Sequence, residues 1–371
     1  MRAGCAISRE EDVNLAARDA CSRALDAADL DSAGCLIVTA TPEHLDEAVE
    51  LCEALRDVAG FEAQIVGGAT TACMVHGDSE TEEGPALGVL ALEHPAALFT
   101  FREGDVKSLR AAAQEMPAGS LGLVFIDPGG PLQRVAAALS REAQGHRLAG
   151  GGVAVEGGLL FDDDLNDAHA VGAFFPVPGR VLVAQSHQPL GKPMLVTRSE
   201  QRSLLEIDSR PAAEALSALN ALPGFSPDAL QFIGLGLCPQ PGEPFDPDDF
   251  IEVPLLGVDE ETAALETGVP VPEGHSISFT LRDGMGARRT LQTALAGLGA
   301  QGKPPPQFGL YFDCVSRGTT LYGVNGLDLG LIEKALGLFP LMAFRTSFEL
   351  GPAGPATAMH LFTGVLALGD E

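Results

Sequence analysis

The sequence has no tryptophan, only two tyrosines among 371 residues, and little positive charge. Lys and Arg together number 23 against 51 Asp and Glu, which gives a formal net charge of −28. A surface that binds nucleic acid or anionic lipid needs clustered basic side chains to neutralise phosphates. We therefore expect neither nucleic acid nor an anionic membrane among the partners, and a surface on which copies of the chain repel one another.

The seven cysteines are odd in number and widely spaced, and no two form a Cys-x-x-Cys pair. This pattern argues against a disulfide framework and against a structural zinc site. No apolar run reaches the ~18 residues that a membrane-spanning helix needs. The N-terminus lacks the apolar core of a signal peptide. We expect a reduced, cytoplasmic and soluble protein with no membrane insertion.

Short apolar runs that are typical of buried strands alternate along the chain with segments of helical periodicity. Thr41-Pro42, for example, is a helix start that directly follows such a run. The fold class is therefore α/β or mixed α+β, with mixed β-sheets flanked by helices. The length predicts two domains. We place a helical lead-in at 1–30 and domains at 31–206 and 207–371, with the boundary near Glu206 to Pro211.

A strand–helix–strand–loop–strand unit occurs three times, in residues 34–92, 122–175 and 308–368. Small residues mark equivalent places in each copy, and they are 21 or 22 residues apart: Gly67 and Gly88, Gly150 and Gly172, Ala343 and Gly364. Fixed self-spacing of this kind is typical of an internal repeat, although Gly-rich loops can coincide by chance. Most polar residues of these units lie where strands end.

Two glycine pairs follow strands, Gly67-Gly68 before Thr70-Thr71 and Gly150-Gly151 in the second copy. Adjacent glycines let the backbone approach a ligand closely, and threonine hydroxyls can hydrogen-bond a polar molecule. The alternative is a tight turn with no ligand. The sequence contains neither a GxGxxG nor a GxxxxGK[ST] motif, so a phosphate cradle for nucleotides is not indicated.

His187 follows a strand in the segment Gln185 to Gly191. A histidine at such a place can contact a ligand, act as a general base or ligate a metal or haem. It can equally be a buried side chain with its own partners. The acidic run Asp162 to Asp164 suits a divalent cation, but a solvated loop explains it as well, and we predict no metal site.

The third copy carries the densest group of candidate site residues, namely Asp313, Cys314, Arg317, Gly318, Arg345, Glu349 and His360. A Cys with a His and an Asp can form a nucleophilic triad. No nucleophile turn surrounds Cys314, however, and an apolar strand end is where inert cysteines lie, so we predict no catalytic residue. Two arginines suit the carboxylate of an amino acid, and Glu349 suits its amine. An Arg–Glu pair that only braces the loops is the alternative.

These motifs, taken in order, resemble the FIST family, whose members pair a FIST N-terminal with a FIST C-terminal domain. The resemblance covers nearly the whole chain. It rests on four stretches and the residues that close the chain, quoted as they stand: Val66-Gly67-Gly68, Gly157-Gly158-Leu159-Leu160-Phe161-Asp162, Gln185-Ser186-His187-Gln188-Pro189-Leu190-Gly191, Phe312-Asp313-Cys314-Val315-Ser316-Arg317-Gly318, and Phe348-Glu349-Leu350-Gly351-Pro352 with His360 and Thr363-Gly364.

The resemblance implies a sensory module that binds an amino acid or a related small polar metabolite in signal transduction. It also implies haem-based sensing of nitric oxide as an alternative, and a separate signalling protein as the partner that receives the signal. Two positions depart from the family pattern. His187 stands where the pattern has Cys, and Ala343 stands where it has Gly. The first departure bears on ligand or metal preference. A cysteine-dependent hydrolase is the third hypothesis. The ligand and the oligomeric state are not predicted.

Overall fold

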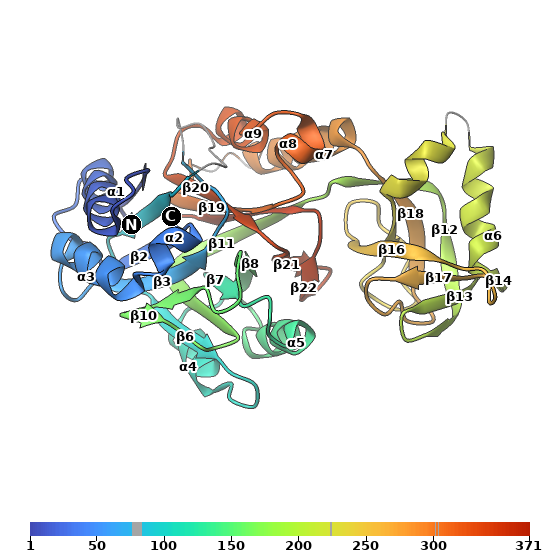
Figure 1. Ribbon diagram of the computed structural model, residues 1–371, viewed down its shortest axis with the longest axis horizontal. Coiled ribbons are helices and arrows are strands. Elements are labelled where there is room, and N and C mark those ends of the chain that lie inside the picture. The colour runs from blue at the N-terminus through green and yellow to red at the C-terminus, as the bar shows by residue number, and fades with distance from the viewer. Residues whose placement is uncertain (76–83, 223–224, 301, 303) are drawn as a thin grey trace.

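The computed structural model describes residues 1–75, 84–222, 225–300, 302 and 304–371, and it has two lobes (Figure 1). A larger body contains both chain termini, and a smaller lobe contains the strands between residues 187 and 282. The chain passes between the lobes at residues 184–187 and again at 282–284. The mixed α/β class that the sequence predicts is confirmed.

The first sheet of the body has the order β1-β5-β2-β3-β9-β10. Helix α1 begins after Asp12, whose carboxylate accepts from the Leu15 N–H as an N-cap. Residues 3–8, inside the predicted helical lead-in, form strand β1, which pairs with β5. The elements of this layer are β1 Ala3–Ser8, α1 Val13–Ala28, β2 Cys35–Ala40, α2 Pro42–Leu45, α3 Ala48–Ala59, β3 Gln64–Ala69, β5 Leu87–Leu92, β9 Leu159–Phe161 and β10 Asp164–Leu165.

The second sheet has the order β22-β21-β8-β7-β11-β23-β19-β20-β4, with β6 also paired to β11. Its strands are β4 Cys73–Val75, β6 Ala97–Phe101, β7 Ser120–Ile126, β8 Arg147–Gly152, β11 Ala170–Ala184, β19 Phe308–Cys314, β20 Leu341–Thr346, β21 Glu349–Ala353, β22 Ala356–His360 and β23 Gly364–Gly369. Its helices are α4 Lys107–Glu115, α5 Leu132–Glu142, α7 Gly284–Gly299, α8 Thr319–Tyr322 and α9 Leu327–Leu336.

The three predicted copies share one topology. In each copy the first strand pairs in parallel with the second and antiparallel with the last: β2 with β3 and β5, β7 with β8 and β11, β19 with β20 and β23. This arrangement confirms the repeat, because a chance run of Gly-rich loops would not reproduce the same pairing three times.

The copies also exchange short strands in a cycle. Strand β9, from the loop of the second copy, pairs with β3 of the first. Strand β21 of the third copy pairs with β8 of the second, and β4 of the first pairs with β20 of the third. Each copy thus completes the edge of another copy, and the exchange brings the three loops to a common centre.

The core of the body lies between its two sheets. The rings of Phe125, Phe312 and Phe344 pack there, with centroids 4.9–6.1 Å apart. Burying a side chain of this size contributes about 1.5–3 kcal/mol. All seven cysteines are free thiols. Within the described residues, no helix combines the length and the hydrophobicity of a membrane span.

The smaller lobe is a seven-stranded sheet in the described residues, with the order β12-β18-β15-β16-β17-β13-β14 and a separate core. It includes strands on both sides of the boundary predicted near Glu206 to Pro211, and that boundary stays a prediction. The elements are β12 His187–Glu200, β13 Ser203–Ile207, β14 Arg210–Pro211, α6 Ala212–Ser217, β15 Ile233–Leu237, β16 Ile251–Asp259, β17 Ala264–Thr267 and β18 Ser276–Arg282, with short 3-10 helices at Ala218–Ala221 and Pro227–Phe232.

Candidate functional site

The loops that follow β3, β8 and β20 contact one another at the centre of the body. The Thr70 hydroxyl is buried and bonds both the Ala72 and the Arg345 backbone. The Ser347 N–H donates to the Gly152 carbonyl, and the Ala154 N–H donates to the Ala69 carbonyl. The sequence therefore singled out three loops that do lie together. Thr71, in contrast, is exposed to solvent.

The glycine pairs are packed against protein. A Cβ on Gly67 would overlap the Val38 carbonyl oxygen, and a Cβ on Gly150 would overlap that of Val124. The neighbouring glycines Gly68 and Gly151 face the loop of another copy in the same way. These positions need glycine because strands cross closely there. Their predicted contact with a ligand stays a prediction.

Arg317 is 1% exposed, and it lies at the centre of a buried hydrogen-bond network. Burial alone would lower the pKa of its guanidinium, but the carboxylate of Asp328 and its neighbours raise that pKa well above the usual value. A guanidinium has five N–H donors, and five hydrogen bonds use them: Nε and Nη2 to Asp328, Nη1 to the Ala184 carbonyl and to Ser186, and Nη2 to Tyr322. A ligand carboxylate would have to displace one of these partners.

Arg345 is also buried, and its guanidinium forms an ion pair with Asp313. Gly318 lies against this guanidinium with a φ of +55°, and a Cβ there would overlap Arg345 Nη2. Asp313 Oδ1 is 3.4 Å from Arg317 Nε, so one carboxylate lies between the two arginines. The arginines that the sequence assigned to a ligand are thus brought together, and each has a carboxylate of the chain itself beside it.

Glu349 is fully buried at the start of β21. It accepts from the Thr346 hydroxyl and from the hydroxyl and N–H of Thr363. Burial raises its pKa to about 8 despite these bonds, so the carboxyl is mostly protonated at neutral pH. Its cross-strand neighbour His360 is buried, with Nε2 3.1 Å from the Pro352 carbonyl. Burial lowers the pKa of His360 to about 4.

Cys314 lies at the end of β19, with its Sγ 3.1 Å from the Ser316 hydroxyl. Burial raises the pKa of its thiol to about 12. A catalytic cysteine needs the opposite shift, since the thiolate is the nucleophile. The geometry therefore does not favour the cysteine-dependent hydrolase, which stays a hypothesis.

His187 begins β12 at the junction between the lobes, directly after Ser186, whose hydroxyl accepts a hydrogen bond from Arg317. Its ring is 5.2 Å from that of Phe362, and its Nε2 is 3.7 Å from Glu252 of the smaller lobe. Burial and then Arg282 lower the pKa of His187 to about 3. Burial raises the pKa of Glu252 to about 8, and its bond from Thr280 offsets this only in part.

Sequence reasoning missed Glu252 and Arg282. Glu252 interrupts an apolar strand, and a lone carboxylate in such a run is the signal that could have found it. Arg282 ends β18 beside His187, and its guanidinium donates to the Ser316 carbonyl of the larger body. Both residues lie far from the quoted motifs in sequence, so only the fold relates them to His187.

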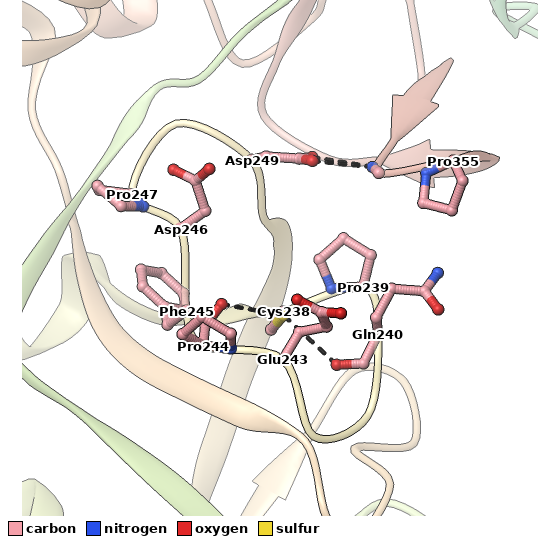
Figure 2. Close-up of a pocket in the computed structure, with 11 residues that line it drawn as sticks. Cys238, Pro239, Gln240, Glu243, Pro244, Phe245, Asp246, Pro247, Asp249 and Pro355 are labelled. Atoms are coloured by element: carbon pink, nitrogen blue, oxygen red, sulfur yellow. Dashed lines mark hydrogen bonds between the residues drawn. The ribbon is translucent and has the colours of Figure 1, made fainter.

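A cavity of about 560 Å³ lies between the lobes, also outside the predicted residues. Figure 2 shows the loop Pro239–Asp249 of the smaller lobe on one side and the β21–β22 turn at Pro355 on the other. Both carboxylate oxygens of Asp249 accept from the Gly354 N–H, at 3.2 and 2.9 Å, which ties the lobes across the opening. Glu243, Asp246 and Asp249 line the cavity together with the ring of Phe245, and no Lys, Arg or His is among the described residues of the lining.

The surroundings of the histidines and acidic residues bear on whether the protein can hold a metal ion or haem. Within the described residues, no group of three or more His, Cys, Asp and Glu side chains is placed to hold a metal ion. A porphyrin needs an open slot beside its axial imidazole. The His187 ring instead packs on Phe362, and His360 Nε2 bonds a carbonyl. The surroundings of these histidines as they stand do not fit haem, and haem binding stays a hypothesis.

Comparison with protein families gives two matches, which together cover most of the chain. The FIST N domain matches residues 34–210, and the FIST C domain matches residues 212–352. The chain belongs to the FIST family. FIST domains are sensory domains, so the sensory class that the resemblance implied is established at the level of the family. The identity of a FIST ligand does not follow from these matches.

Mycobacterial relatives match this FIST protein along their full length. "Uncharacterized protein Rv0628c" of Mycobacterium tuberculosis is 30% identical and covers 99% of each chain. "Uncharacterized protein Mb0898c" of Mycobacterium bovis is 27% identical over 99% of this chain and 98% of its own. The two-lobed architecture is thus expected in these relatives as well.

Proposed function

We propose that the protein is a cytoplasmic receptor that binds an amino acid or a related small polar metabolite between its two lobes. The observation that supports this most directly is the cavity of about 560 Å³ (Figure 2). Pockets of about 300–1,000 Å³ suit small molecules. This one is lined by both lobes, so an occupant changes how the lobes contact each other.

The charge of the lining selects the ligand. Three carboxylates line the cavity, and none of the described side chains of the lining carries a positive charge. An ammonium group is attracted to these carboxylates and to the face of Phe245. The ligand therefore carries an amine. This differs from the first hypothesis, in which Arg317 and Arg345 hold a carboxylate, because both arginines already have partners within the chain.

The signal passes through the link between the lobes. Asp249 and Gly354 form the contact across the cavity, and a ligand ammonium competes for the same carboxylate. A change in this contact alters the surface that both lobes present to a separate signalling protein. We propose no catalytic role for Cys314, because its thiol is buried and protonated.

A thermal-shift screen against amino acids and amines tests the proposal. Ligand at 100 times its Kd should raise stability by about 2.7 kcal/mol. Asp249→Asn and Glu243→Gln should weaken the response to every hit. Glu214→Gln is the control, since Glu214 lines a different hollow in the same lobe. Failure of a broad metabolite panel to shift the wild-type protein would contradict the proposal. A Soret band on haem addition that His187→Ala removes would favour the haem hypothesis instead.

A further inference from the structure

The junction between the lobes holds a second set of polar groups, separate from the cavity. His187 of β12 and Arg282 of β18 are direct cross-strand partners, so their side chains project from the same face of the sheet. That face meets the larger body. The His187 ring packs on Phe362, and the Arg282 guanidinium donates to the Ser316 carbonyl.

Both side chains carry a buried nitrogen that lacks a partner. His187 is 5% exposed, and its Nδ1 has no hydrogen-bond partner among the described residues. The Nε of Arg282 is buried and unpartnered in the same sense. Buried polar atoms are rarely left in this state unless a water or a ligand completes them.

The positive charge of Arg282 is a second unusual feature of the junction. In the described part of the chain, no carboxylate forms an ion pair with Arg282, and burial lowers the pKa of its guanidinium. Two other acidic groups at the junction are held neutral, because burial raises the pKa of Glu252 to about 8 and that of the Cys314 thiol to about 12. In a protein with a net charge of −28, the Arg282 guanidinium thus has no ion-pair partner among the described residues.

We propose that the junction binds a small carboxylate, whose oxygens accept hydrogen bonds from Arg282 Nε and His187 Nδ1. The neutral ring of His187 has its Nε2 turned to the carboxyl of Glu252. A protonated Glu252 favours Nε2 as the acceptor, which places the ring hydrogen on Nδ1. A planar carboxylate matches two such donors better than a spherical ion does. The two residues lie where the smaller lobe meets the larger body, and the proposal is independent of the amine-binding cavity.

The test uses the full chain and compares sodium acetate with sodium chloride at equal ionic strength. Acetate should raise the Tm saturably, and Arg282→Gln and His187→Asn should weaken its apparent Kd at least tenfold. Arg180→Gln is the matched control. Arg180 also has an unpartnered Nε, but its guanidinium is 2.6 Å from Asp370. The control should keep the wild-type Kd.

Equal responses to acetate and chloride, or an undiminished response in Arg282→Gln, would overturn the proposal. Tighter binding of inorganic phosphate than of acetate would overturn the carboxylate class.

A direct measurement covers the case in which a variant fails to fold. The ¹H–¹⁵N signal of Arg282 Nε, identified by its loss in Arg282→Lys, should shift as acetate is added to the wild-type protein. The Arg180 Nε signal should stay in place. An Arg282 signal that does not move at saturating acetate contradicts the assignment.

Discussion

Arg317 and Arg282 lie on the two sides of the junction between the lobes, and they differ in what surrounds them. The Arg317 guanidinium donates five hydrogen bonds, and its Nη2 lies 2.7 Å from a carboxylate oxygen of Asp328. Among the described residues, the Arg282 guanidinium makes one hydrogen bond, to a backbone carbonyl, and its Nε has no partner. The first arginine stabilises the fold. The second keeps donors that a ligand can use, although only the first lies in a recognisable motif.

The largest effect should come from breaking the Arg317 side of this comparison. Arg317→Ala leaves Asp328 buried without its cation, which should cost about 3–5 kcal/mol in the free energy of unfolding. Urea denaturation measures it. Arg282→Gln, which leaves no carboxylate unpaired, should cost about 1 kcal/mol. Equal losses in the free energy of unfolding would mean that Arg282 stabilises the fold as much as Arg317 does.

Gly318→Ala tests the packing around the second arginine of the network. The substitution introduces a Cβ at a φ of +55° and overlaps the Arg345 guanidinium. We expect a loss of about 3 kcal/mol in urea denaturation. Gly337→Ala is the control, with a φ of +84° and no atom of a described residue within 4 Å of the added Cβ, and should cost about 1 kcal/mol. A loss no larger than that of the control would show that the Arg345 side chain moves away from the added Cβ at little cost in stability.

The buried carboxyls of Glu349 and Glu252 should make the stability of the two lobes depend on pH. Burial raises the pKa of Glu349 in the body and of Glu252 in the smaller lobe to about 8. Each folded carboxyl keeps a proton that the unfolded chain releases above its usual pKa of 4.5. Stability is therefore lost as pH rises from about 4.5 to 8, by about 1.4 kcal/mol per pH unit for each group.

Unfolding series at several pH values check this. Glu252→Gln and Glu349→Gln should each gain stability relative to wild type as pH rises through that window, and level off above it. A pH-independent difference between either variant and wild type would show that the pKa of the folded carboxyl is not raised above that of the unfolded chain.

The smallest expected effect concerns the link across the cavity. Asp249→Asn weakens a charge-assisted bond to the Gly354 N–H in a partly exposed place. We expect a loss of about 0.5–1 kcal/mol in urea denaturation. The neighbouring Asp248→Asn is the control and should be neutral. A loss above about 2 kcal/mol in the free energy of unfolding would mean that Asp249 stabilises the fold of a lobe and not only the contact between the lobes.

Much of the larger body could be predicted from sequence. Apolar runs, the helix start at Thr41-Pro42 and the glycine spacing define three copies, because these signals are local. The cyclic exchange could not be predicted, since β4 and β9 are three residues long and show no periodicity. That exchange is what brings the loops of the three copies together.

The candidate site was predicted in part. Sequence order placed Asp313, Arg317 and Arg345 at neighbouring strand ends, and they do meet. It could not show that Asp328 satisfies Arg317, because that pairing depends on how α9 packs. Nor could it find Arg282 or Asp249, which approach the body only through the placement of the smaller lobe.

The most direct test of the receptor proposal is isothermal titration of the best amine-bearing hit into wild-type protein and into a Glu243→Gln, Asp249→Asn double variant. The cavity predicts a Kd at least tenfold weaker in the double variant and unchanged in Glu214→Gln. An unchanged Kd in the double variant would contradict binding between the lobes.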